Sequence, residues 1–175
     1  PEQMVEFVHE QSSERTLSLV LDALEKDPKT NEAIFRQVFQ DKNFGWERRA
    51  AALHVLTKAS LTSGKEALLN WLPELSAAQK RELTQLLSSS SEGVNLLLSG
   101  YGQKGFLGAD DITLTTAERI HQNNLSEPRG TQLLEEVNQL AEQEKQLFDT
   151  KLKKYMAIAD QQQGDIIKGK TLFQT

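Results

Sequence analysis

The sequence predicts an all-α fold, a solenoid of about four helix pairs with a long linking helix toward its C-terminal end. Apolar residues recur at helical spacing along the chain, and the alternation typical of strands is nearly absent. Helix pairs predicted to start near Ser13, Trp46, Ser76 and Thr115 lie roughly 30–40 residues apart, a period typical of helical repeats. The chain is 38% hydrophobic with a mean hydropathy of -0.51, which suits thin layers whose helices each bury one stripe.

Four apolar stripes predict the helices of the first half. Each stripe follows the three- and four-residue steps that place side chains on one face of a helix. Pro73 closes the fourth stripe, because proline cannot continue the backbone hydrogen bonding of a helix. The stripes are Leu17, Val20, Leu21 and Leu24; Ile34, Phe35, Val38 and Phe39; Ala52, Leu53, Leu56 and Ala59; and Ala67, Leu68, Trp71 and Leu72.

One unit carries a more specific repeat pattern. An acidic turn at Asp41 is followed by an apolar residue, an arginine, small residues and then leucines. Small residues let two helices approach closely, and an arginine can bridge the turn of a neighbouring unit. The arginine is Arg48 or, in a register shifted by one, Arg49. The pattern resembles a HEAT repeat and consists of Asp41, Trp46, Arg48, Ala51, Ala52, Leu53 and Leu56.

Polar residues mark the next helix boundaries. Ser76 and Gln79 have the spacing of a capping box, with Leu75 as the apolar residue before the cap. Ser88–Ser91 is a polar break between two helices. The first helix carries Leu83, Leu86 and Leu87 inward, and the shorter second one carries Val94, Leu96, Leu97 and Leu98.

The second half starts with the longest predicted loop, residues 99–112. Thr115 and Glu118 match a second capping box, and Ser126 is the predicted cap of the next helix, with Pro128 in its first turn. A long charged helix follows and ends at Gly164. The predicted stripes are Leu133, Leu134, Val137 and Leu140, then Phe148, Leu152, Tyr155 and Ala159.

Composition argues against several functional classes. The net charge is -5, and Lys151, Lys153 and Lys154 form only a short basic cluster, so we expect no nucleic-acid partner. The absence of cysteine excludes disulfides, thiolate zinc sites and cysteine nucleophiles within the segment. No apolar run approaches the roughly 20 residues that span a bilayer, so we expect no membrane insertion. The chain begins at Pro1 and reads as an excised fragment.

Gly100, Gly102 and Gly105 give the spelling GxGxxG of dinucleotide-binding proteins. That motif needs a strand before it and a helix directly after it, whereas a leucine-rich helix precedes this one and a loop follows. We therefore interpret it as a glycine-rich loop. Ser63, Gly64 and Lys65 lack the upstream glycine of a P-loop and indicate a turn.

Other candidate residues also favour structural roles. The histidines, at positions 9, 54 and 121, are far apart and lack partners at metal-ligand spacing. Asp110 and Asp111 have no neighbouring pocket that would shift a pKa, and indicate a loop cap. Asn124-Leu125-Ser126 spells a glycosylation sequon, and Trp46 and Trp71 are predicted core or interhelix residues. We assign no catalytic, cofactor-binding or metal-binding residue.

The C-terminal residues carry a resemblance. Residues 113–138 lead into a long helix, and then Gly164, Asp165, Gly169 and Phe173 spell GDxxxGxxxF. Together they resemble the segment that joins HEAT-like repeats to a c-type cytochrome. Such segments occur in large exported proteins of planctomycete, verrucomicrobial and Bacteroidetes type, known as membrane-bound or sorbosone-type dehydrogenases. There the motif leads into Cys-x-x-Cys-His, so haem ligands are expected beyond Thr175, and none lies in this chain.

The resemblance implies three parts: a repeat domain at 1–142, a linking helix at 143–163, and the start of a cytochrome domain at 164–175. It implies a non-catalytic scaffold or spacer in a periplasmic or cell-surface protein, contacting neighbouring domains of its own chain and possibly another protein. A HEAT adaptor that binds a protein or peptide is the first alternative. An enzyme that uses the loop Gly100–Asp111 is the second.

Overall fold

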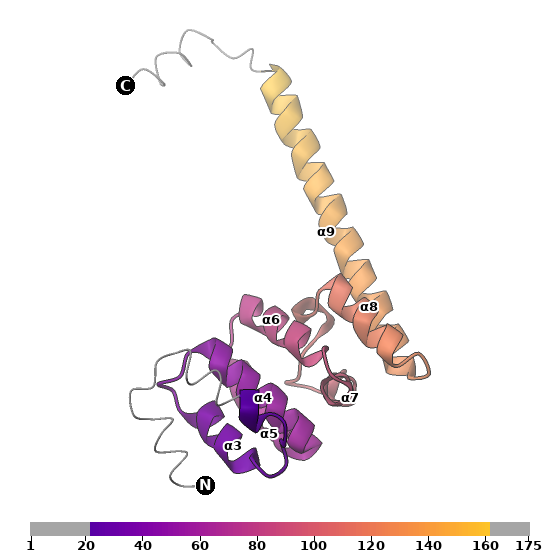
Figure 1. The fold of residues 1–175 in the computed structure, drawn as a ribbon. Helices are drawn as coiled ribbons and strands as arrows, with labels where there is room; N and C mark the ends of the chain where they lie inside the picture. Colours follow the sequence, from indigo (N-terminus) through magenta and orange to yellow (C-terminus); the bar gives the residue numbers. More distant parts are fainter. Residues whose placement is uncertain (1–21, 162–175) are drawn as a thin grey trace, which may run out of the picture. The chain divides into compact units, whose positions relative to one another are not determined.

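The computed structural model describes residues 22–161, with side chains to Ala157, and the regular elements in that range are all helical (Figure 1). The all-α prediction is therefore confirmed. The predicted start near Ser13 and the motif at 164–173 lie outside the described residues. The α-helices are α3 Glu32–Gln40, α4 Trp46–Ala59, α5 Leu61–Trp71, α6 Ala77–Leu87, α7 Ser91–Gly100, α8 Leu114–Asn123 and α9 Pro128–Gln161; the short 3₁₀ turns are η1 Leu72–Glu74 and η2 Ala109–Asp111.

The chain divides into two compact units, residues 1–137 and residues 138–175. The first unit contains α3 to α8 and the first turns of α9. The second contains the remainder of α9, which is one helix of 34 residues rather than the two predicted from the sequence. The predicted division at 142 and 163 stays a prediction.

Helix α4 is the centre of the first unit. It contacts α3 and α5, its neighbours in the chain, and also α6 and α7. Seven of its residues are buried, including Leu53, which has no exposed surface, and Leu56. The predicted stripe of α3 is confirmed, since Ile34, Phe35 and Val38, together with Phe39, are all buried. Burial of these stripes removes apolar surface from water and holds the layers together.

A cluster of aromatic rings joins α3, α4 and α5. Trp71 lies edge-on to Phe39, with ring centroids 5.3 Å apart, and next to Trp46 at 5.9 Å. The guanidinium of Arg49 lies 4.7 Å from the centre of the Trp71 ring, and its Nε donates a 2.8 Å hydrogen bond to the carbonyl of Phe39. Arg49 thus bonds the last turn of α3, and both tryptophans have the predicted packing role.

Side-chain caps fix several helix starts. The capping box of Ser76 and Gln79 is present at α6, as predicted. At α8 the cap is Thr113, whose hydroxyl accepts from the Thr116 backbone, so the predicted start at Thr115 was wrong by two residues. Helix α9 begins at Pro128, so the residue in the N-cap position is Glu127 and not the predicted Ser126.

Candidate functional site

The glycine loop has the structural context of a helix end and not of a nucleotide site. Gly100 is the last residue of α7, and Gly102 and Gly105 adopt φ values of 79° and 82°, which favour glycine. The next element is the 3₁₀ turn η2. The hydroxyl of Tyr101 donates to the Glu136 carboxylate in the first turns of α9, and burial followed by this contact raises the pKa of Tyr101. The loop is thereby held in place.

The acidic pair of η2 closes this loop. Asp111 is buried, and its Oδ2 accepts a 3.2 Å hydrogen bond from the Gly108 backbone. Its Oδ1 lies 3.6 Å from the Nζ of Lys80, while the carbonyl of Asp110 accepts from the guanidinium of Arg81. A hollow of about 330 Å³ beside the loop is lined by Tyr101 and Glu136, among others, but by neither aspartate. The carboxylate of Asp111 thus has the predicted capping role, and the backbone carbonyl of Asp110 helps to join η2 to α6.

The two described histidines lie in different helices and have different surroundings. His54 is buried in α4, and its Nε2 lies 2.9 Å from the hydroxyl of Ser90, which caps α7. His121 is in α8, where its Nδ1 has no hydrogen-bond partner among residues 22–157. Within the same range no three acidic or histidine side chains gather in a group that could hold a metal ion. His9 lies outside the described residues. His54 therefore joins α4 to the start of α7.

His54 makes the stability of the fold depend on pH. Burial lowers the pKa of His54 below its ordinary value of 6.5, and Lys58 lowers it further, against the opposing effects of Glu25 and Glu92. The unfolded chain therefore takes up a proton at this position at a higher pH than the folded chain does. The resulting stability is present above about pH 6.5 and is lost as the pH falls below that value.

We expect the free energy of unfolding to decrease as the pH is lowered from 7 to 5, and less steeply for His54→Gln. Glutamine keeps a hydrogen-bonding group near Ser90 but does not titrate. Urea unfolding monitored by circular dichroism at several pH values measures both slopes. Since His9 and His121 stay in the variant, they act as an internal control. Equal slopes for the two proteins would show that His54 does not cause the pH dependence of stability.

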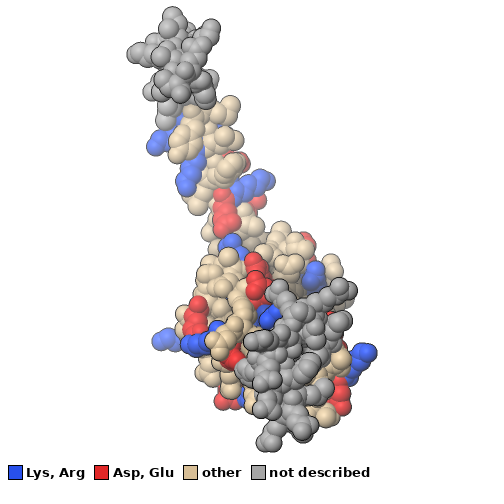
Figure 2. Space-filling model, turned by 60° about the vertical axis from the view of Figure 1, so that its left-hand side comes forward, with Lys and Arg blue, Asp and Glu red and all other residues tan. Residues whose placement is uncertain are grey.

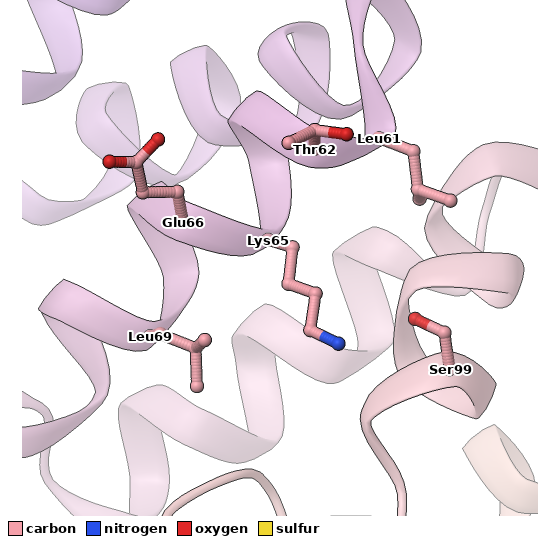
Figure 3. Close-up of a pocket in the computed structure, with 6 residues that line it drawn as sticks. All are labelled: Leu61, Thr62, Lys65, Glu66, Leu69 and Ser99. Carbon is pink, nitrogen blue, oxygen red and sulfur yellow. The ribbon is translucent and has the colours of Figure 1, made fainter.

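A shallow groove of about 520 Å³ lies between α5 and α7 (Figure 3). Leu61, Lys65 and Leu69 extend from α5 on the side that faces Ser99 of α7, and Thr62 and Glu66 also line the groove. Leu61 and Leu69 are 42% and 37% exposed, although both are large and apolar. No pattern in the sequence predicts this groove. The apolar stripe of α5 predicts only the buried face of that helix. No local pattern indicates that Ser99 lies opposite Lys65.

The second unit exposes several large apolar side chains of α9. Phe148, Leu152 and Tyr155, which were predicted to share one face, are all exposed. Leu147 and Met156 are exposed as well and were not predicted. On the face that Figure 2 shows, basic and acidic side chains are interspersed over the described part of the chain. No helix between residues 22 and 161 is both long and apolar enough to cross a membrane.

The comparisons with known proteins found no relatives. No protein family, no curated protein and no solved structure matches this chain.

Proposed function

We propose that this segment is a non-catalytic helical scaffold and spacer in a larger exported oxidoreductase-like protein. In that protein it positions a downstream cytochrome c domain. The observation that carries the spacer role is α9, one helix of 34 residues, which spans about 51 Å at the usual rise per residue. A continuous helix keeps a fixed length, which a flexible linker does not.

The scaffold role also includes a HEAT-like solenoid as the arrangement of the first unit. Contacts of α4 with both α6 and α7 support this, because stacked helix pairs bury their stripes against the following pair. The bond from Arg49 to the end of α3 has the bridging role that the repeat pattern requires. The candidate catalytic groups have structural partners instead: Asp111 holds Gly108, and His54 contacts Ser90.

The haem context rests on the resemblance of Gly164–Phe173 and its neighbours. Determining the parent gene beyond the codon of Thr175 tests this part. A Cys-x-x-Cys-His within the next few codons would support the cytochrome junction. A stop codon, or a longer reading frame without that motif, would exclude it.

The spacer role predicts a stiff helix in the second unit. Cysteines that replace the exposed residues Gln139 and Lys154 can each carry a spin label. The two positions are 15 residues apart, so the labels should lie about 22 Å apart with a narrow distance distribution. The chain has no native cysteine, so labelling is specific. Double electron–electron resonance on samples diluted with unlabelled protein measures the intramolecular distance.

The matched control replaces the exposed Gln146 and Thr150 by glycine between the two labels. Each glycine disfavours the helix by about 1 kcal/mol, so this variant should show a broader distribution. A broad distribution in the unsubstituted helix would contradict the spacer role.

The adaptor role is the second candidate, and the groove between α5 and α7 favours it. Two exposed leucines flank Lys65 there, an arrangement that suits an apolar segment carrying a carboxylate. If the parent reading frame lacks the haem motif, this becomes the leading proposal.

A further inference from the structure

The C-terminal part of α9 presents an apolar face of its own. Alternating steps of three and four residues place Ala141, Glu144, Phe148, Lys151 and Tyr155 on one side of the helix, as in a coiled coil. We call this set the α9 seam. Within it, Phe148 is 65% exposed and Tyr155 67% exposed. Side chains of this size are rarely grouped on an exposed helix face unless a partner covers them.

Further apolar side chains widen this face. Leu140 and Leu147 lie along one margin of the seam and Leu152 along the other, and all three are exposed. The opposite side of the helix carries polar residues such as Glu142, Gln146 and Lys153. The second unit thus has the two-faced pattern of a helix that pairs with another helix.

We propose that the α9 seam and the leucines along its margins bind the same face of a second copy of this chain, with the two helices antiparallel. The charges inside the seam select this occupant and this orientation. In a parallel pair in register, Glu144 would face Glu144 of the other copy, and Lys151 would face Lys151. In an antiparallel pair centred between Leu147 and Phe148, each Glu144 faces the other copy's Lys151, so that two opposite-charge contacts form.

The same antiparallel register also matches the apolar side chains. It brings the seam residues Phe148 and Tyr155 to the level of the margin residues Leu147 and Leu140 of the other copy. Both pairs occur twice because the arrangement has twofold symmetry. One register therefore satisfies the charged and the apolar positions together.

Interactions within a single helix do not account for Glu144 and Lys151. The two residues are separated by two turns, about 10 Å along the axis, which is too far for an ion pair. Neither has an ion pair among the described side chains. Both lie more than two turns from either end of α9, where the helix dipole no longer favours one sign of charge.

Charge reversal tests the pairing in the full 175-residue chain. Glu144→Lys and Lys151→Glu should each raise the dimer dissociation constant at least about tenfold, because each places like charges in contact. The double variant Glu144→Lys with Lys151→Glu should return it to within about threefold of the original, since both contacts re-form with signs exchanged. Analytical ultracentrifugation over a concentration series measures all four proteins.

The matched control is Glu142→Lys, which makes the same charge change on the opposite side of the helix. It should leave the dissociation constant within about threefold of the unsubstituted value. Circular dichroism verifies that all variants keep their helical content. A chain that stays monomeric throughout the series, because another segment or a downstream domain covers the seam, would overturn the proposal. So would single reversals without effect.

Cysteine cross-linking tests the orientation separately. Since the chain has no cysteine, Leu140→Cys and Tyr155→Cys introduce single thiols. In the antiparallel dimer, a disulfide forms when the two variants are mixed and oxidised, and neither variant alone cross-links efficiently. Cross-linking of Leu140→Cys with itself and not with Tyr155→Cys would indicate a parallel pair and refute the charge argument.

Discussion

Replacing Leu53 by alanine should lower the free energy of unfolding by about 3–5 kcal/mol, the upper part of the range for buried leucines. Leu53 has no exposed surface and belongs to α4, the helix that contacts four others. Because α4 is held between several helices, we expect the surrounding side chains to fill the vacated volume only in part. Urea unfolding monitored by circular dichroism at pH 7 measures the loss.

Leu134→Ala is the matched control for this prediction. The sequence places Leu53 and Leu134 alike on apolar stripes. In the structure, Leu133 is 1% exposed, whereas Leu134 is only partly buried. The same chemical change at Leu134 should therefore cost about 1–2 kcal/mol, because part of the side chain is already in water. Equal losses at the two positions would show that the burial described here is wrong.

The helix faces of the first unit were predictable because they depend on local spacing alone. The stripe of Ile34, Phe35, Val38 and Phe39 matches the buried side of α3 residue for residue. The start of α6 was predictable for a similar reason, since a capping box joins residues only three positions apart. Local patterns of this kind need no knowledge of the remaining fold.

Predictions were less accurate where two local patterns compete. Thr113 and Thr115 are both suitable caps for α8, and Glu118 favours Thr115 by its spacing. The structure selects Thr113, which brings Thr116, Ala117 and Ile120 into the core. This start also keeps a side-chain cap, because the Thr113 hydroxyl accepts from the Thr116 backbone.

Contacts between distant residues could not be predicted from spacing. The bond from Arg49 to Phe39 and the groove that brings Ser99 opposite Lys65 both depend on how separate helices pack. The continuity of α9 was missed for another reason. On sequence, the stripe that ends at Leu140 and the stripe that begins at Phe148 resemble two helices, whereas the structure has one helix whose fully buried residues end at Val137.

Replacing Gly93 by alanine should destabilise the fold by more than about 3 kcal/mol, although alanine is ordinarily the better helix former by about 1 kcal/mol. Gly93 lies in the first turn of α7, close to the last residue of α6. A Cβ atom at this position would lie 1.9 Å from the carbonyl oxygen of Leu87 and 2.7 Å from its carbonyl carbon. These atoms belong to the backbone, so no side-chain rotation can relieve the overlap.

Gly130→Ala provides the control, because it makes the same substitution in the first turn of another helix. There the nearest atom to an added Cβ is the Cα of His121 at 3.7 Å, an ordinary contact distance. We therefore expect Gly130→Ala to raise the free energy of unfolding by about 0.5–1 kcal/mol, as helix propensity alone predicts. Thermal and urea unfolding of both variants separate the two effects. If Gly93→Ala were as stable as Gly130→Ala, then α7 could not start as close to the end of α6 as the structure has it. In that case the contact that brings Ser90 to His54 would also have to be revised, because Ser90 lies between the two helices.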